Sequence, residues 1–207
     1  MEENDEQGVA MTWKGVTVTT RAGRPLLRGV DGVTLPGSMT ALMGASGAGK
    51  TTLLNTLLVR NLKGLEVDGE IRVNGNELGK GIVSVSAYVQ QEDLFVGTLT
   101  VGEHLHMQAK MRLPSSWSAE QKRERVEKVA REMLLEGSMK TRIGIAGVEK
   151  GISGGEMKRL AFATEILADP PILFCDEPTT GLDSHTTMLV VKQLDLLASQ
   201  QNKTILC

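Results

Sequence analysis

The 207-residue sequence predicts an α/β fold with a parallel core sheet, an antiparallel β side sheet and a helical subdomain. Three observations lead to this class. A short apolar run ends in a glycine-rich loop and a helical segment follows, which is the order that opens a parallel sheet. The apolar run at 172–175 lacks polar alternation, as expected for a strand covered on both faces by helices. In the middle of the chain, over 97–152, the sequence is helical and rich in charge.

The N-terminal half predicts strands and one helix. Residues 11–20 (MTWKGVTVTT) alternate apolar and polar residues, as a half-buried strand does. Residues 26–37 continue with β-type residues broken by glycines, which favours an antiparallel hairpin or a small side sheet. The apolar run 39–44 predicts a buried strand, and a helix is expected over 51–60. Two further strands are predicted over 69–75 and 84–90.

The middle of the chain predicts two helices, over residues 101–113 and 118–137. The second is highly charged; Ser118 is placed to cap its start and Gly137 to end it. Its apolar residues are expected on one side: Val126, Val129, Met133 and Leu134. The remaining elements are a strand over 172–175, a helix over 184–200 and a strand beginning at 203.

This pattern divides the chain into four parts. They are an acidic disordered tail (1–10), the side sheet with the core around the glycine-rich loop (11–96), the helical subdomain (97–152) and a C-terminal core segment (153–207).

Composition excludes several classes of protein. The formal net charge is −2, so the chain lacks the basic surface that holds nucleic acid. Its two cysteines, Cys175 and Cys207, are too few for a disulfide framework, which favours a reducing, intracellular compartment. The sequence shows no apolar run of the roughly 18–20 residues that a membrane-spanning helix needs.

A glycine-rich loop predicts a nucleotide site. The segment GASGAGKT fits G-x-x-x-x-G-K-[ST], in which glycines let successive backbone N–H groups face one anion at a helix N-terminus. Lys50 is expected to reach the β- and γ-phosphates, and Thr51 to ligate Mg²⁺ through its hydroxyl. The alternative is a plain glycine-rich turn before a helix. The predicted ATP contacts here are Gly44, Ala45, Ser46, Gly47, Ala48, Gly49, Lys50, Thr51 and Thr52.

Two adjacent acids, Asp176 and Glu177, follow the predicted strand 172–175. Ligands of parallel sheets bind at this end of a strand. Asp176 is expected to hold Mg²⁺, and Glu177 to polarise the water that attacks the γ-phosphate. The alternative is that Pro178 ends the strand and both acids are solvated loop residues.

A second glycine pair starts another helix, in Ser153-Gly154-Gly155-Glu156. By itself this segment fits a capping box, in which the serine caps the helix and the glutamate reaches back. Consecutive glycines at a helix start cost backbone entropy, which is tolerable where a ligand approaches the main chain closely. One nucleotide is already accounted for, so a second site on the same molecule would be redundant.

The motifs resemble those of ATP-binding-cassette (ABC) domains. Walker A (GASGAGKTT), the signature ISGGE, Walker B (ILFCDE) and GLDS at 181–184 occur in the order of that family and cover nearly the whole chain. The segments AYVQQEDLF, GTLTVGEHL and KRLAFATEILADPPILFCDEPTTGLDS are similar to the G subfamily, most of all to its White–Scarlet half-transporters. The resemblance implies an ABC-type cassette of the P-loop NTPase fold, with ATP and Mg²⁺ as cofactors.

The resemblance also assigns residues. It implies a head-to-tail dimer in which Ser153, Gly154, Gly155 and Glu156 form the signature site for the ATP of a partner cassette. Gln91 matches the glutamine that links Mg²⁺ or the attacking water to the helical subdomain, although Gln90 beside it leaves this open by one position. Asp183 matches an aspartate that crosses the dimer interface; its alternative is an acid at a helix N-terminus. The implied catalytic residues are Glu177, Gln91 and Lys50, and the implied metal ligands are Thr51, Gln91 and Asp176.

The function implied is the ATPase of a membrane transporter. Its partners would be a second cassette, identical or a different White-type half-transporter, and the transmembrane domain of a longer polypeptide, without nucleic acid. It would be membrane-associated at the cytoplasmic face, although the fragment itself is expected to be soluble. The alternative is a soluble ABC-type ATPase, or a regulatory module without transport. The span between Lys50 and Ser153 leaves no room for the long coiled coil of repair proteins, and a simple P-loop kinase would lack ISGGE and GLDS.

Some family features have no match. Thr20 stands where many cassettes stack an aromatic on adenine, so adenine contact is unassigned, with Arg21 nearby; Trp13 is expected to pack internally. The family's switch histidine would follow the last strand, so the chain reads as truncated before it and is expected to bind MgATP but hydrolyse it poorly. His104 and His106 do not match that position and are expected at the surface of the helical subdomain.

Overall fold

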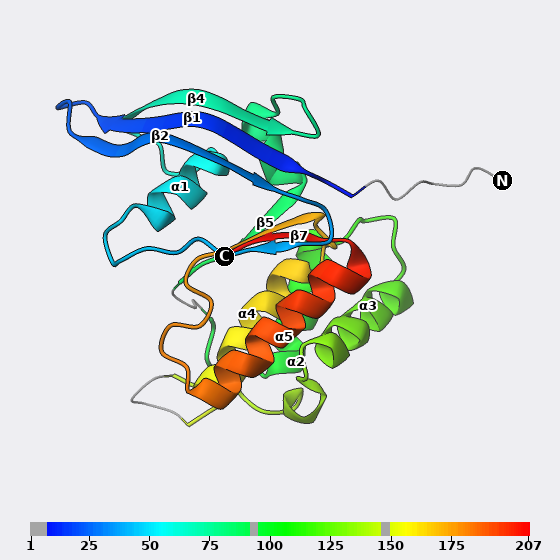
Figure 1. Ribbon diagram of the computed structural model, residues 1–207. Coiled ribbons are helices and arrows are strands. Elements are labelled where there is room, and N and C mark those ends of the chain that lie inside the picture. The colour runs from blue at the N-terminus through cyan, green and yellow to red at the C-terminus, as the bar shows by residue number, and fades with distance from the viewer. Residues whose placement is uncertain (1–7, 92–94, 146–149) are drawn as a thin grey trace. The chain divides into compact units, whose positions relative to one another are not determined.

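A computed structural model describes residues 8–91, 95–145 and 150–207 (Figure 1). It confirms the α/β class, with one antiparallel sheet, one sheet with parallel pairing, and helices. The chain divides into two compact units. Unit 1 contains the chain up to Tyr88 together with Pro171–Asp176 and Leu194–Cys207, and unit 2 contains Val89–Pro170 and Glu177–Gln193. The four-part division predicted from the sequence stays a prediction, and most of its acidic tail lies outside the described residues.

Unit 1 holds the two sheets and a short helix. The antiparallel side sheet has the order β2-β1-β4, formed by Pro25–Thr34, Met11–Thr20 and Leu65–Val73. The core sheet has the order β3-β7-β6-β5, formed by Met39–Thr40, Thr204–Leu206, Ile172–Cys175 and Ser86–Val89. The helix α1 is Lys50–Leu57, and a 3-10 turn covers Gly79–Ser84. The pairs β3–β7 and β6–β7 are parallel, as predicted.

The side sheet packs on α1 through one apolar cluster, and Figure 1 shows the helix alongside β1 and β2. Trp13 and Val16 both point into this cluster although an odd number of positions separates them. The irregular register around Gly15, whose φ is 63°, absorbs the extra residue. Trp13 is buried, and a Cβ on the paired Gly32 would lie 2.2 Å from its ring. The expectation that Trp13 packs internally is therefore confirmed.

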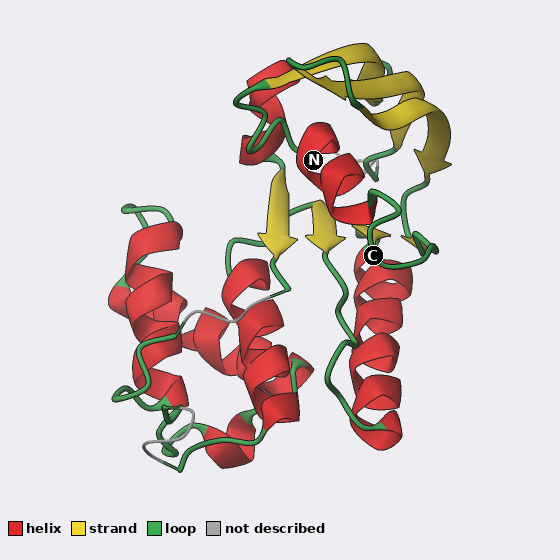
Figure 2. Cartoon of the chain, turned by 90° about the vertical axis from the view of Figure 1, so that its left-hand side faces the viewer, coloured by secondary structure: helices red, strands yellow, loops and turns green. Residues whose placement is uncertain are grey.

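Unit 2 is built around three helices that pack on one another, which Figure 2 draws with their connecting loops. They are α2 (Val101–Arg112), α3 (Ala119–Glu132) and α4 (Gly154–Ile166), with a 3-10 turn at Glu136–Ser138. Each helix begins with a capping box, and Ser118 caps α3 as predicted. The last helix, α5 (Ser184–Gln201), begins in unit 2 and ends in unit 1.

Several predicted boundaries are wrong, among them the start of β4, which begins at Leu65 rather than at 69. The helix α3 ends at Glu132 rather than at Gly137, because Leu134 takes a left-handed backbone with φ 54°. That turn buries Met133 and Leu135 completely and leaves Leu134 half exposed, so Leu134 is not on the apolar side. The helix α1 ends at Leu57 instead of 60, just before Val59, which is also left-handed. The strand expected over 39–44 is only Met39–Thr40, because the chain then turns into the glycine-rich loop.

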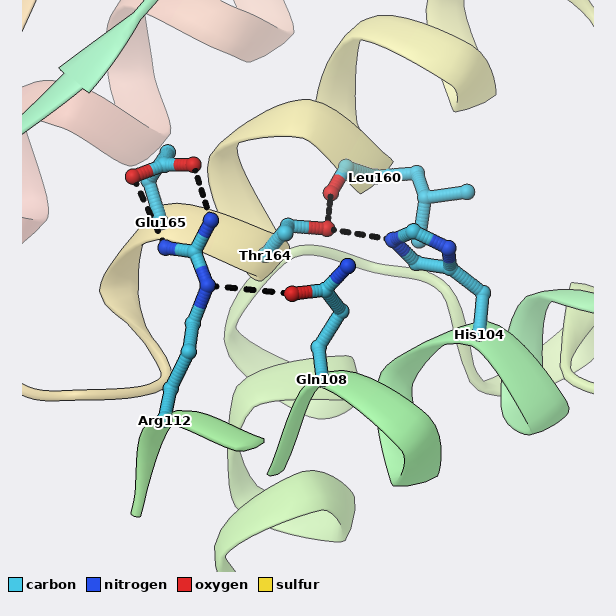
Figure 3. Close-up of polar contacts among 6 residues, drawn as sticks. All are labelled: His104, Gln108, Arg112, Leu160, Thr164 and Glu165. Carbon is cyan, nitrogen blue, oxygen red and sulfur yellow. Dashed lines mark hydrogen bonds and ion pairs between the residues drawn. The ribbon is translucent and has the colours of Figure 1, made fainter. Parts of the chain in front are cut away.

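His104 corrects another expectation, since it is buried between α2 and α4 rather than at the surface (Figure 3). Its Nε2 lies 3.0 Å from the hydroxyl oxygen of Thr164, which donates its own proton to the carbonyl of Leu160. The Nε2 of His104 must therefore be the donor. Burial, together with the charge of Arg112, lowers the pKa of His104 and favours this neutral form. His106 is partly buried.

Arg112 makes a second link between α2 and α4 (Figure 3). Its two terminal nitrogens donate to the two carboxylate oxygens of Glu165 at 2.9 and 2.7 Å. Its Nε donates to Gln108 at 3.0 Å, which holds the guanidinium plane in place. Such two-point pairing adds a fixed geometry to the attraction between charges. It therefore helps to hold α2 against α4, the helix that begins in the signature segment.

Candidate functional site

The predicted phosphate loop lies between β3 and α1 in unit 1. The N-cap of α1 is Gly49 with φ 97°, where a Cβ would lie 2.7 Å from the side chain of Leu27. Only glycine fits this combination of backbone and space. The Nζ of Lys50 donates to the carbonyl oxygens of Gly44 and Ala45 at 3.0 and 3.3 Å. The ammonium group is therefore held against the start of the loop.

The loop suits a triphosphate. Its residues Ser46, Gly47 and Ala48 are exposed, and the space around the Cα of Gly47 is open. The first N–H groups of α1 have no acceptor within the helix, and its dipole favours an anion at this end. Together with Lys50, these donors supply the positive side of a phosphate site.

Asp176 follows β6 and is buried, with 3% of its surface exposed. One carboxylate oxygen accepts a hydrogen bond from the Thr51 hydroxyl at 3.1 Å, although 125 positions separate the two residues. The other accepts from the Tyr88 hydroxyl at 3.0 Å. Thus, both oxygens have partners, and the predicted metal ligands Thr51 and Asp176 lie side by side.

Tyr88 was missed in the sequence, where it reads as one residue of a strand. Burial raises its pKa, and the nearby negative charge of Asp176 raises it further. The hydroxyl therefore stays protonated and donates to the carboxylate. The guanidinium of Arg60 lies 5.0 Å from the centre of the Tyr88 ring, a cation–π distance that steadies the ring.

The oxygens of Thr51 and Asp176 fit Mg²⁺, which prefers one or two protein oxygens together with phosphate and water. Within the described ranges 8–91, 95–145 and 150–207, no group of three or more histidine, cysteine, aspartate or glutamate residues could hold a metal.

Glu177 belongs to unit 2, where its carboxylate accepts hydrogen bonds from neighbouring side chains. The amide of Gln91 donates to it at 3.1 Å, and the hydroxyl of Thr180 at 3.0 Å. The side chain of Gln91 therefore reaches Glu177. The backbone φ of Glu177 is 47°, a strained value for a residue other than glycine, of the kind that collects at functional sites.

The signature segment forms the capping box that was the alternative interpretation. The Ser153 hydroxyl oxygen accepts from the backbone N–H of Glu156 at 3.2 Å, and the Glu156 carboxylate accepts from the N–H of Ser153 at 2.8 Å. The hydroxyl of Ser138 also donates to Glu156, and this bond is the largest cause that lowers its pKa. Glu156 thus fixes the helix start, while Ser153 and Gly154 remain exposed.

The second glycine of the pair has a packing reason of its own. A Cβ on Gly155 would lie 2.3 Å from the methyl group of Thr186 on α5, whereas nothing lies within 4 Å of a Cβ on Gly154. Close packing inside unit 2 therefore requires Gly155, independently of any ligand. Whether the pair contacts a partner's ATP stays a prediction.

Asp183 caps α5 and so matches its alternative interpretation. Its carboxylate accepts from the backbone N–H groups of His185 and Thr186 at 3.0 and 3.1 Å, and from the Thr186 hydroxyl at 2.7 Å. These bonds lower the pKa of Asp183, and the bond from the Thr186 hydroxyl is the largest cause. Its role at a dimer interface stays a prediction.

Residues 27–180 match the model of the ABC transporter family. The chain belongs to this family. The ATP-binding protein/permease wht-3 of Caenorhabditis elegans is 46% identical over 197 residues, which is 92% of this chain and 32% of that protein. Protein scarlet of Drosophila melanogaster is 44% identical over 208 aligned residues, 98% of this chain and 31% of its own length. Protein white of the same fly is 50% identical over 184 residues, which is 87% of this chain and 27% of that protein.

The chain is therefore an ABC nucleotide-binding domain of the White and Scarlet type. ABC domains bind ATP, generally with Mg²⁺, and members of the family hydrolyse it. The chain spans about a third of the length of these curated relatives. In the part of it that the structure describes, no helix is long and apolar enough to cross a membrane.

Proposed function

We propose that this chain is the ATP-binding and ATP-hydrolysing domain of a White-like half-transporter, which powers the movement of a substrate across a membrane. The observation that carries the proposal is the contact between Thr51 and Asp176, because it joins the phosphate loop to the acid of the second motif. Membership of the ABC family and the named relatives support it.

The residues of the site divide the work. Lys50 and the loop Gly44–Gly49 hold the triphosphate, and Thr51, Asp176 and Gln91 hold Mg²⁺, which offsets phosphate charge when it is bound. Glu177 accepts a proton from the attacking water, and Gln91 helps to orient that water. The donors Gln91 and Thr180 keep the Glu177 carboxylate in one orientation before substrate arrives.

The second half of each ATP site comes from a partner cassette, identical or another White-type half-transporter. Ser153, Gly154 and Gly155, with Glu156 fixing their helix start, face the partner's nucleotide, and Asp183 lies at the interface. Hydrolysis then requires two chains, so the isolated chain is weakly active at low concentration. The name of one relative, an ATP-binding protein/permease, supports a transmembrane domain in the same polypeptide and a place at the cytoplasmic face of a membrane.

The experiment is the molar mass of the Glu177→Gln chain by light scattering, with and without MgATP. We expect the mass to double with MgATP, because the substitution prevents turnover and the bound triphosphate bridges two chains. The control is Lys50→Ala combined with Glu177→Gln, which should remain a monomer. A chain that binds ATP and stays monomeric at all concentrations contradicts the trans roles of Ser153–Gly155. A chain that binds no ATP contradicts the nucleotide site itself.

A further inference from the structure

Lys158 is a buried lysine on α4, one turn beyond the start of the signature helix. It is 4% exposed, and its Nζ donates to the carbonyl oxygens of Gln90 and Gln91 at 3.0 and 3.2 Å. Burying an ammonium group is costly unless hydrogen-bond acceptors replace water. Here the two carbonyl oxygens are such acceptors, and Lys158 thereby holds the backbone just after β5.

The same backbone carries a side chain of the predicted catalytic set. The side-chain amide of Gln91 donates to Glu177 at 3.1 Å, and Thr180 donates to the same carboxylate oxygen. A continuous series of contacts thus runs within unit 2 from α4 through Lys158 and Gln91 to Glu177. Its other end is Ser153, the N-cap of α4.

We propose that Lys158 is a positioning residue that couples the signature end of α4 to Gln91 and Glu177. The inference rests on the proposed function, in which Ser153 contacts the partner's nucleotide while Gln91 and Glu177 act on the chain's own. Because Ser153 and Lys158 belong to one unbroken helix, a shift of its N-terminus moves the carbonyls of Gln90 and Gln91 as well. Lys158 thereby links the two ATP sites of the dimer.

The first test needs no nucleotide. Backbone and side-chain amide order parameters of Gln91 are measured by NMR in the wild-type chain and in Lys158→Met, which keeps the length of the side chain and removes its donors. We expect values near about 0.85 in the wild type and below about 0.6 in the variant. Lys158→Arg, which keeps charge and donors, should retain the wild-type values, and so should Lys192→Met, an exposed lysine of the same unit. An unchanged Gln91 in Lys158→Met overturns the proposal.

The second test separates positioning from general stability. Lys158→Met should lower ATP turnover by about 2- to 30-fold, with thermal stability followed in parallel. In the double variant with Gln91→Ala, turnover should fall no further than in Gln91→Ala alone, since Lys158 acts through Gln91. Effects that multiply would show that Lys158 acts elsewhere and would overturn the proposal.

The two proposals fail in different ways. If the wild-type chain binds no fluorescent ATP analogue, the proposed function is wrong, yet the order parameters of Gln91 still report whether Lys158 holds it. If the chain binds ATP and dimerises but Lys158→Met matches the wild type in both tests, only the coupling is wrong.

Discussion

Tyr88→Phe should reduce the gain in ATP affinity that Mg²⁺ gives, while leaving the affinity for ATP without Mg²⁺ unchanged. The substitution removes a single oxygen, the one that donates to Asp176 at 3.0 Å, and leaves the ring beneath Arg60. Asp176 is almost fully buried and would keep one partner, Thr51. If the Thr51 hydroxyl bound a metal ion instead of Asp176, the carboxylate of the variant would lose both of its present side-chain donors.

The magnitude follows from the charge of the acceptor. A hydrogen bond to a charged group contributes about 1.5–3 kcal/mol to the free energy of unfolding. At this chain length each kcal/mol corresponds to about 2–4 °C in melting temperature, so we expect a loss of roughly 3–12 °C. Substitutions of residues that orient metal ligands cost about 10- to 100-fold in metal affinity, and the lower end applies because Thr51 remains.

The assay is a titration with a fluorescent ATP analogue in Mg²⁺ and again in EDTA. The dissociation constant in EDTA should be unchanged in Tyr88→Phe, while the gain in affinity that Mg²⁺ gives the wild type should fall about tenfold. Arg60→Gln is the control, because it removes the cation over the ring and leaves the hydroxyl in place. If Tyr88→Phe loses stability but keeps the full response to Mg²⁺, the hydroxyl supports the fold alone and the reasoning about Asp176 is refuted.

Two further predictions concern unit 2. Lowering the pH from about 7.5 to about 5 should destabilise the chain through His104, because the unfolded histidine takes up a proton near pH 6.5 while burial depresses the folded pKa. The loss is at most about 1.4 kcal/mol per pH unit, is measured by urea unfolding, and should vanish in His104→Phe, which keeps a ring beside Phe95. Gly155→Ala should be less stable than Gly154→Ala by about 1–3 kcal/mol in the same assay, since only the first places a Cβ against Thr186.

Their controls follow from the same contacts. The Nδ1 of His104 has no hydrogen-bond partner among the residues that the structure describes, so a proton there would add an unpaired buried charge. An identical pH slope in His104→Phe would mean that other groups cause the loss. For the glycine pair, Thr186→Ser removes the methyl group in the way and should rescue Gly155→Ala; failure of that rescue would contradict the clash.

Local patterns could be predicted from the sequence because their partners are close along the chain. The capping box at Ser118 and the one at Ser153 each join residues three positions apart. The phosphate loop is local for the same reason. The contact between Thr51 and Asp176 is distant along the chain, but parallel strands bring their carboxyl ends to one edge, so it too could be anticipated.

Other contacts gave no signal of that kind. Whether Lys158 faces solvent or two carbonyls depends on how α4 packs, which a charged residue in a helix does not reveal. The end of α3 was misjudged because glycine at 137 favours a helix end, whereas the burial of Met133 and Leu135 outweighs the strain of a left-handed Leu134. In both cases packing over long range overrides local preference.

The adjacent carboxylates of Asp176 and Glu177 are held by different hydrogen-bond donors. Two neighbouring carboxylates that shared one set of partners would repel each other. Here Asp176 accepts from Thr51 and Tyr88, whereas Glu177 accepts from Gln91 and Thr180. The left-handed φ of Glu177 costs about 1–3 kcal/mol, so the surrounding structure must hold the residue in place. Each acid thus has its own set of donors, which is what the proposed roles of metal ligand and proton acceptor at consecutive positions require.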